Sequence, residues 1–406
     1  MRRVTILIPF LLSLSITIAQ KKAVFVIVDG IPADVIEKIN TPALDSIAKA
    51  GGYKRVYVGG EKGGYSETPT ISAVGYNSVM TGVWVNKHNV WDNDIAAPNY
   101  NYWNLFRLMK SSNPSKKIAI FSSWLDNRTK LVGENLSSAG NIKFDHHYDG
   151  LELDTVNYPH DNKRDFMHRI DESVTDHAAS YIRSNAPDLS WVYLEYTDDM
   201  GHMHGDSKEF YTAVELMDKQ MKRLWDAIQY RRKNFKEDWL IVITTDHGRD
   251  SATGKNHGGQ SDRERRGWIV TNAKNLNAHF KTGNPSIVDI TPTIASFLNI
   301  KIPRSQAMEV DGISLIGKVS AVEPKAVLDN NKITVSWKPM EQNGNVKIWI
   351  SLTNEFKTGR KDEYKSAGQF PLKNGKAVLD VSKMPSKFYK IVIETPTNML
   401  NRWITK

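Results

Sequence analysis

The sequence has 406 residues, a length that favours about two domains. Hydrophobic residues make up 40% of it and aromatic residues 10%, a composition that excludes a disordered chain. The net charge of +9 is uneven: residues 319–406 hold 15 Lys and Arg against 8 Asp and Glu, whereas residues 20–318 hold 37 of each sign. This balance gives no support for a nucleic-acid groove in the larger part. Solvated Lys on exposed strands is the commoner reason for a basic tail.

The first nineteen residues have the pattern of a secretory signal peptide. Arg2 and Arg3 precede an apolar run over 4–14, and small residues follow up to Ala19. The run is too short to span a bilayer, although an uncleaved anchor is an alternative. The sequence has no Cys, which excludes disulfides and thiolate metal sites. We therefore expect an exported bacterial protein, periplasmic or secreted, with no transmembrane helix after removal of residues 1–19.

A buried strand is predicted near the start of the remaining chain. Residues 22–28 (KAVFVIV) form a continuous apolar run that ends at Asp29. A helix is predicted over 41–50, because Thr, Pro and Gly stand at the positions that begin and end helices. A second apolar stretch follows at 53–58. This succession favours an α/β fold with a mostly parallel sheet.

A helix of small residues is predicted next, and it carries a candidate nucleophile. Residues 66–82 read SETPTISAVGYNSVMTG, with a helix start expected at 68–70 and Ser72 in the first turn. Free N–H groups and the helix dipole favour an anion there. An ordinary capping Ser is the alternative for Ser72. Asn93 follows in HNVWDN and could hold a phosphoryl oxygen, or it could be a simple loop residue.

Metal-ligand residues follow two further predicted strands. After the run 191–196, Asp198 and His202 stand one helical turn apart, a spacing that lets both reach one ion, although Asp199 and His204 could compete. An amphipathic helix is expected over 210–230. The run 239–245 is followed by three more candidate ligands, namely Asp246, His247 and His257. Open α/β sheets bind ligands at such strand ends, and Asp oxygens and neutral His nitrogens are donors that Zn²⁺ accepts.

Other polar residues near these motifs have less specific interpretations. Residues 145–149 (DHHYD) resemble a metal cluster by composition, but no predicted strand end precedes them, so we expect a surface loop. Arg249, Lys255 and Arg263 lie near the last motif in sequence and could contact substrate or be loop charges.

The character of the sequence changes around 312–324. Alternating strands are predicted at 332–337, 346–352 and 387–393, with Asn-Gly turns between strands. We predict a catalytic domain over 20–318, with a helix-rich return to its sheet at 285–300. Residues 319–406 are predicted to form a small β-sandwich similar to a fibronectin-like module.

Six short motifs together resemble a known family. They are VDG (28–30), PTISAVGYNSVMTG (69–82), HNVWDN (88–93), DDMGHMHG (198–205), TTDHG (244–248) and HGG (257–259). Over residues 22–318 their order and spacing resemble the alkaline phosphatase superfamily and, within it, the type I phosphodiesterase/nucleotide pyrophosphatase family. The resemblance implies an alkaline-phosphatase-like α/β fold, with a mostly parallel sheet sandwiched by helices. It also implies hydrolysis of a small phosphate-ester substrate.

The same resemblance implies two divalent metal ions, with zinc expected. One ion would be held by Asp198, His202 and His257; the other would be held by Asp29, Asp246, His247 and the oxygen of Ser72. Two neighbouring ions can clamp the attacking and leaving oxygens together. Ser72 would attack phosphorus and form a covalent phospho-enzyme. Asn93 matches the family's phosphate-binding Asn.

Departures from the family pattern leave the substrate open. The family usually has Thr at the position of Ser72, and an aromatic residue and Pro at the positions of Ala73 and Val74. The departures count against nucleotide specificity. A phosphomonoesterase, a phosphonoacetate- or phosphoethanolamine-type hydrolase and a non-catalytic surface protein are alternatives. No C/S-x-P-x-R motif is present, which argues against a sulfatase.

Overall fold

A seven-stranded sheet organises most of the chain. The computed structural model describes residues 19–405, so residues 1–18 of the predicted signal peptide lie outside the described part. The sheet has the order β2-β7-β6-β1-β5-β3-β4. Strand β7 pairs antiparallel with β2 and β6, and the other strand pairs of this sheet are parallel. The strands are β1 (Gln20–Val28), β2 (Gly52–Tyr57), β3 (Ile118–Ser122), β4 (His146–Tyr148), β5 (Leu189–Leu194), β6 (Glu237–Thr244) and β7 (Arg266–Thr271).

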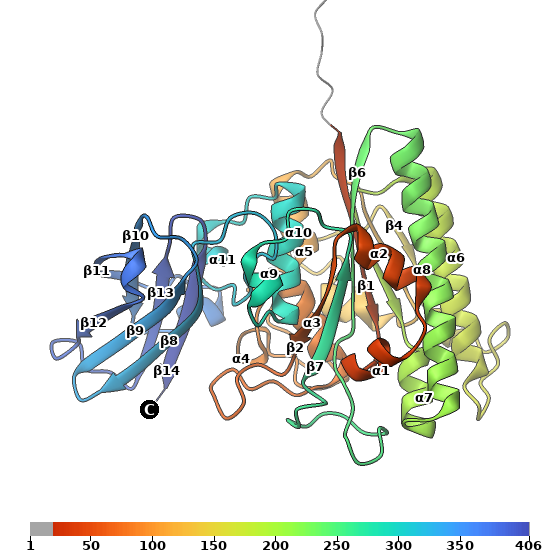
Figure 1. The fold of residues 1–406 in the computed structure, drawn as a ribbon, viewed down its shortest axis with the longest axis horizontal. Helices are drawn as coiled ribbons and strands as arrows, with labels where there is room; N and C mark the ends of the chain where they lie inside the picture. Colours follow the sequence, from red (N-terminus) through yellow and green to blue (C-terminus); the bar gives the residue numbers. More distant parts are fainter. Residues whose placement is uncertain (1–18, 406) are drawn as a thin grey trace, which may run out of the picture.

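Helices cover both faces of this sheet (Figure 1). One face packs against α1 (Ala33–Lys38), α2 (Pro42–Ala50), α6 (Asp165–Asn185) and α8 (Lys208–Asn234). The other packs against α3 (Ser72–Thr81), α5 (Leu105–Ser112) and α10 (Ile290–Leu298). From residue 23 to 28, successive β1 side chains alternate between the two cores, so this part of β1 is apolar. This arrangement confirms the predicted α/β fold. Short helices complete it: α4 (Val85–His88), α7 (Tyr196–His204), α9 (Ala278–Thr282) and α11 (Arg304–Ala307).

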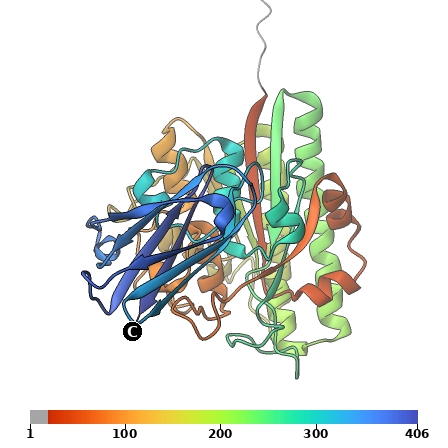
Figure 2. The ribbon, with the colours of Figure 1, turned by 60° about the vertical axis from the view of Figure 1, so that its left-hand side comes forward.

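Two antiparallel sheets follow at the C-terminal end of the chain (Figure 2). One has the order β12-β9-β8 and the other β11-β10-β13-β14. Their alternating buried residues form a core of their own. The strands are β8 (Ala321–Asp329), β9 (Lys332–Pro339), β10 (Asn345–Ser351), β11 (Lys365–Pro371), β12 (Lys376–Asp380), β13 (Phe388–Glu394) and β14 (Met399–Thr405). The predicted C-terminal β structure is confirmed, whereas a domain boundary at residue 318 stays a prediction.

Two local predictions were wrong. Residues 145–149 are no loop, because His146–Tyr148 form β4, which pairs in parallel with β3 at the sheet edge. The helix expected to start at 68–70 begins at Ser72 instead. The segment before it pairs with a distant loop: Gln260 donates to the Thr68 carbonyl over 2.7 Å, and Thr70 Oγ1 donates to the Gly259 carbonyl over 2.8 Å. These bonds hold the segment extended. The helix-rich return predicted at 285–300 consists of a short 3₁₀ turn, Ile287–Asp289, followed by α10.

Buried ion pairs join the two parts of the chain. Lys87 of α4 is fully buried and donates to Asp311 Oδ1 over 2.6 Å and to Asn401 Oδ1 of β14 over 2.8 Å. Lys390 of β13 is also fully buried and lies 2.8 Å from Glu309 Oε1 and 2.6 Å from Asp362 Oδ2. Burial is the largest influence on Lys87 and lowers its pKa. Each ammonium group therefore depends on carboxylates that are themselves removed from water.

Replacing Lys390 with Met should destabilise the protein by about 3–5 kcal/mol, because Glu309 and Asp362 would remain buried without a cation. Urea unfolding measures the effect. Lys387→Met is the control, because Lys387 precedes β13 and is exposed. Equal unfolding midpoints for these variants would contradict the structural role of Lys390.

Candidate metal centre and active site

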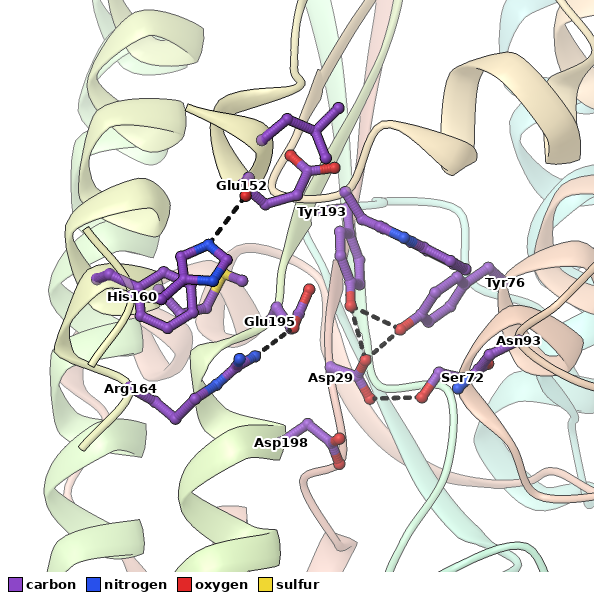
Figure 3. Close-up of a pocket in the computed structure, with 14 residues that line it drawn as sticks. Asp29, Ser72, Tyr76, Asn93, Glu152, His160, Arg164, Tyr193, Glu195 and Asp198 are labelled. Carbon is purple, nitrogen blue, oxygen red and sulfur yellow. Dashed lines mark hydrogen bonds and ion pairs between the residues drawn. The ribbon is translucent and has the colours of Figure 1, made fainter. Parts of the chain in front are cut away.

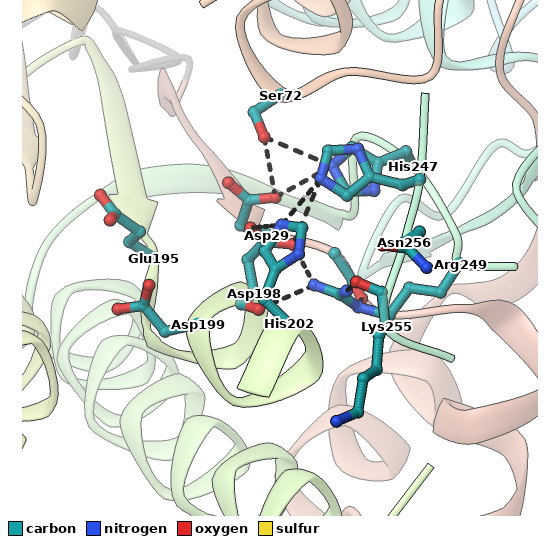
Figure 4. Close-up of polar contacts among 12 residues, drawn as sticks. Asp29, Ser72, Glu195, Asp198, Asp199, His202, His247, Arg249, Lys255 and Asn256 are labelled. Atoms are coloured by element: carbon teal, nitrogen blue, oxygen red, sulfur yellow. Dashed lines mark hydrogen bonds and ion pairs between the residues drawn. The ribbon is translucent and has the colours of Figure 1, made fainter. Parts of the chain in front are cut away.

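Three carboxylates meet at the ends of three neighbouring strands. Strands β6, β1 and β5 lie side by side and run parallel. Asp29 directly follows β1, Asp246 stands two residues beyond β6, and Asp198 lies in the first turn of α7 after β5. All three side chains are buried. The sheet topology therefore places the predicted acids together, as Figure 4 shows for Asp29 and Asp198.

His247 is the centre of one cluster. Its Nε2 lies 3.4 Å from Asp29 Oδ1, 3.3 Å from Asp246 Oδ2 and 3.3 Å from Ser72 Oγ. Ser72 Oγ lies 3.5 Å from Asp29 Oδ1. These four residues are the set that the sequence assigns to one ion.

Asp198 belongs to the second cluster. Its carboxylate lies 3.2 Å from His202 Nε2 and 4.0 Å from His257 Nε2, and the two His Nε2 atoms are 3.0 Å apart. The rings of His247 and His257 stack with centroids 3.7 Å apart, so the clusters are adjacent. Asp198 also groups with His247 and His257 in position to share a cation. The structure thus brings all seven predicted ligands together, while Asp199 pairs with Arg164 instead.

The donor atoms of both clusters fit divalent cations. The Nδ1 atoms of His247 and His257 lie 2.9 Å from the carbonyl oxygens of Gly248 and Thr70, a contact that leaves Nε2 of each ring free to bind a metal. Asp246 Oδ2 is buried and makes no hydrogen bond to any residue of 19–405. A buried carboxylate oxygen without a donor is costly unless a cation compensates it.

The pKa values of Asp29 and Asp246 are raised because the acids are buried close to one another. Burial, followed by the charges of Asp246 and Asp198, raises the pKa of Asp29 well above its ordinary value. Burial and the charge of Asp198 raise the pKa of Asp246 to about 7. Asp198 differs: burial would raise its pKa, but the hydrogen bond from His202 and the charge of Arg249 lower it. Positive charge is therefore needed most on the Asp29 and Asp246 side.

Arg249 is a structural support rather than a surface charge. Its guanidinium is fully buried and donates to the Gly30 carbonyl over 3.0 Å, to the Lys255 carbonyl over 2.9 Å and to the Asp198 carbonyl over 2.8 Å. It also pairs with the Asp198 carboxylate. Arg249 thereby connects the ends of β1, β5 and β6. Of the other two candidates, the Lys255 side chain is exposed and Arg263 pairs with Asp34 and Asp206.

Two tyrosines near Asp29 were missed by sequence reasoning. Tyr193 donates to Asp29 Oδ2 over 2.8 Å, and Tyr76 forms a short hydrogen bond to the same oxygen. Both read as core aromatics in the sequence. The available signal was that Tyr76 stands four residues after Ser72, on the same helix face.

Asn93 lies beside the start of α3. Its Oδ1 accepts a hydrogen bond from the Ala73 N–H over 3.0 Å. The side-chain N–H₂ group therefore remains available as a donor. Of the N–H groups expected to favour an anion at the start of this helix, that of Ala73 is thus already paired. Ser72 and Asn93 form part of the wall of a cavity of about 450 Å³ (Figure 3).

Comparison with known families agrees with the sequence motifs. The family described as type I phosphodiesterase / nucleotide pyrophosphatase matches residues 23–313. The chain belongs to this family. The matched range contains all eight predicted catalytic and metal-binding residues. Among residues 19–405, no helix is long and apolar enough to cross a membrane.

Curated relatives of this phosphodiesterase-family chain share short segments with it. A 2,3-bisphosphoglycerate-independent phosphoglycerate mutase of Mycoplasma mycoides is 26% identical over 136 residues, covering 34% of this chain and 24% of the mutase. GPI ethanolamine phosphate transferase 2 of Candida albicans is 29% identical over 148 residues, covering 34% of this chain and 16% of the transferase. The chain thus spans a quarter or less of the length of these relatives.

Solved structures with the same fold have little sequence identity to it. The structure of Ps i-CgsB has a TM-score of 0.53 at 16% identity and covers 78% of this chain and 84% of its own. A 2-O GAG sulfatase has a TM-score of 0.52 at 12% identity, with 90% and 86% covered. Murine ectonucleotide pyrophosphatase / phosphodiesterase 5, an inactive variant in complex with AMP, has a TM-score of 0.50 at 13% identity, with 70% and 96% covered. These likenesses concern the fold alone.

Zinc should raise the melting temperature of the chelated protein more than magnesium does, because His202, His247 and His257 offer nitrogen donors that suit zinc. A free zinc concentration 100 times its dissociation constant adds about 2.7 kcal/mol to the free energy of unfolding. Thermal unfolding with each ion measures this. His257→Ala should reduce the zinc shift, whereas His147→Ala, an exposed His outside both clusters, should keep it. The same zinc shift in both variants would argue against a site at His257.

Proposed function

We propose that this chain is an exported two-metal hydrolase of phosphoric esters that acts through a covalent Ser72 intermediate. Family membership supports the reaction class. The observation that carries the proposal is the position of Ser72 Oγ, within 3.5 Å of both Asp29 and His247 at the wall of a cavity. Export remains a prediction from the pattern of residues 1–19.

Bound divalent cations would supply the positive charge that lowers the pKa of the Ser72 hydroxyl and offsets the charge of the phosphoryl group. The other contributions come from the protein. Asp29 accepts hydrogen bonds from Tyr76 and Tyr193 on Oδ2, which leaves Oδ1 directed at Ser72. The dipole at the start of the ten-residue helix α3 favours negative charge beside Ser72.

The reaction has two steps. Ser72 Oγ loses its proton and forms a bond to phosphorus while the bond from phosphorus to the ester oxygen breaks, and the departing oxygen takes up one proton. Water then attacks phosphorus and loses a proton, the bond from Ser72 Oγ to phosphorus breaks, and Ser72 Oγ regains a proton as the phosphate product leaves. The Asn93 side-chain N–H₂, oriented by its bond to Ala73, donates to a phosphoryl oxygen in both steps.

Phosphomonoester hydrolysis by the same site is the second candidate. It is favoured by Ser72, since the phosphatases that the chain resembles use Ser where the phosphodiesterase branch usually has Thr. The zinc-loaded protein should be assayed with p-nitrophenyl phosphate and with p-nitrophenyl methyl phosphate. Turnover of either ester that is lost on chelation supports the reaction class, and the ratio of kcat/KM values decides between diester and monoester. No turnover of either ester by a folded, zinc-loaded protein would reject the proposal.

Ser72→Ala should reduce kcat by about three orders of magnitude or more, because the group that attacks phosphorus is gone. Ser72→Thr should keep part of the activity, since it retains a hydroxyl. The control is Ser78→Ala on the same helix, where Ser78 Oγ donates to the Val74 carbonyl over 2.8 Å. Ser78 Oγ also lies 3.0 Å from the buried His88 Nε2, so this control should lose about 1–3 kcal/mol of stability but keep turnover per folded molecule. Acid quenching with a labelled substrate should attach label to the Ser72 peptide. Near-normal turnover by Ser72→Ala would move the nucleophile elsewhere.

A further inference from the structure

The cavity beside Ser72 extends away from the metal-ligand clusters. Its volume of about 450 Å³ lies within the usual range for small-molecule sites, about 300–1,000 Å³. One part of its wall is formed by Asp29, Ser72 and Asn93, where a phosphoryl group would react. The remainder is lined by residues of three other segments, and Figure 3 shows several of their side chains around the cavity. An ester bound at Ser72 would place its organic group against this second part.

One side of this second part is apolar. Trp124 lines the cavity and contacts Tyr76 edge to face at 6.3 Å. Leu153 also lines it and is 68% exposed, which places it where the cavity opens to solvent. An aromatic ring and an aliphatic side chain can cover the C–H face of a bound organic group.

The wall also offers a carboxylate oxygen without a partner. Glu152 Oε1 accepts from the Leu125 N–H over 2.6 Å, which fixes the side chain. Its second oxygen, Oε2, is buried and makes no hydrogen bond within the described residues. A buried acceptor of this kind normally has a donor. A ligand group that donates a hydrogen bond would satisfy it.

Another part of the wall offers a fixed donor. Arg164 lines the cavity, and its Nε lies 2.7 Å from Asp199 Oδ2 while its Nη2 lies 3.1 Å from Glu195 Oε1. Its backbone is left-handed with φ 61°, an uncommon conformation for a long side chain. Both ion pairs hold the guanidinium in place. Its Nη1 makes no hydrogen bond to residues 19–405 and stays available to an acceptor.

These free groups discriminate between kinds of ligand. An ammonium group can donate to Glu152 but cannot accept from Arg164. A second phosphate can accept from Arg164, but the carboxylates of Glu152 and Glu195 would repel it. A hydroxyl group both donates and accepts, so separate hydroxyls of one ligand can satisfy Glu152 and Arg164.

We propose that this cavity binds the organic group of the substrate and that this group is a neutral polyol, such as a sugar. The substrate class would then be sugar phosphates or other polyol phosphates. This inference rests on the proposed function, because the phosphoryl group is taken to lie at Ser72.

Competitive inhibition of p-nitrophenyl methyl phosphate hydrolysis by the zinc-loaded, full-length protein tests the inference. The inhibitors are methyl phosphate, which carries no such group, glucose 6-phosphate, phosphocholine and ADP. Glucose 6-phosphate should bind about tenfold or more tightly than methyl phosphate, the effect of one added hydrogen bond to a charged group. Phosphocholine and ADP should show no such gain. Tightest binding of either of those two would overturn the inference in favour of an ammonium or a nucleotide group.

Matched variants locate the effect. Glu152→Gln and Arg164→Lys should each reduce the preference for glucose 6-phosphate over methyl phosphate about fivefold or more, because each alters one of the two free groups. Glu215→Gln, on the exposed face of α8, should keep the preference. An unchanged preference in both cavity variants would contradict the assignment.

Titration calorimetry of the zinc-loaded protein with the same inhibitors separates the two proposals. Preferential binding of glucose 6-phosphate without any turnover would support the cavity assignment and reject the hydrolase. Turnover with no preference among the inhibitors would support the hydrolase and reject the cavity assignment.

Discussion

The mutual repulsion of three buried carboxylates is the constraint on which the site depends. Asp246, Asp29 and Asp198 follow the adjacent parallel strands β6, β1 and β5, so the sheet itself forces them together. Buried like charges must be compensated by protonation, by hydrogen bonds or by cations. The fold compensates each acid differently. Arg249 neutralises Asp198, two tyrosines donate to Asp29, and the Gly30 N–H donates to Asp246 over 3.1 Å.

This unequal compensation explains where the chemistry is expected. Asp198 has a permanent positive partner in Arg249, so its cluster is nearly balanced before any ion binds. Asp29 and Asp246 have only neutral donors among the described residues, apart from the adjacent His247. A cation therefore gains more from binding on that side, where the Ser72 hydroxyl lies within 3.5 Å of both Asp29 and His247.

The strands and the acids could be predicted from the sequence because both are local signals. An apolar run that ends just before Asp29 or Asp246 indicates the strand and the candidate ligand together. The pairing of Asp198 with His202 could be predicted for the same reason, since the two residues stand one helical turn apart. The roles of Arg249 and Tyr193 could not be predicted, because they arise only when distant segments meet. In the sequence, Arg249 is equally consistent with a loop charge and Tyr193 with a core residue. Strand β4 was missed since its three residues are ordered by pairing with β3.

The C-terminal sheets reach the site through the segment that carries Asn93. Lys87 lies six residues before Asn93 and donates to Asn401 of β14 over 2.8 Å. Behind Asn93, the side chains of Asn99 and Asn101 each donate to the Lys357 carbonyl over 3.0 Å. The segment from residue 87 to 101 is thus held to the C-terminal part at both ends. Because Asn93 also bonds to Ala73 at the start of α3, these sheets help to set the distance between Asn93 and Ser72. Loss of the contacts to Asn401 and Lys357 would loosen the Asn93 segment, although Val90 and Ile95 keep it packed on the core. We therefore propose that the C-terminal part acts on the position of Asn93 rather than on the candidate metal ligands that follow β1, β5 and β6.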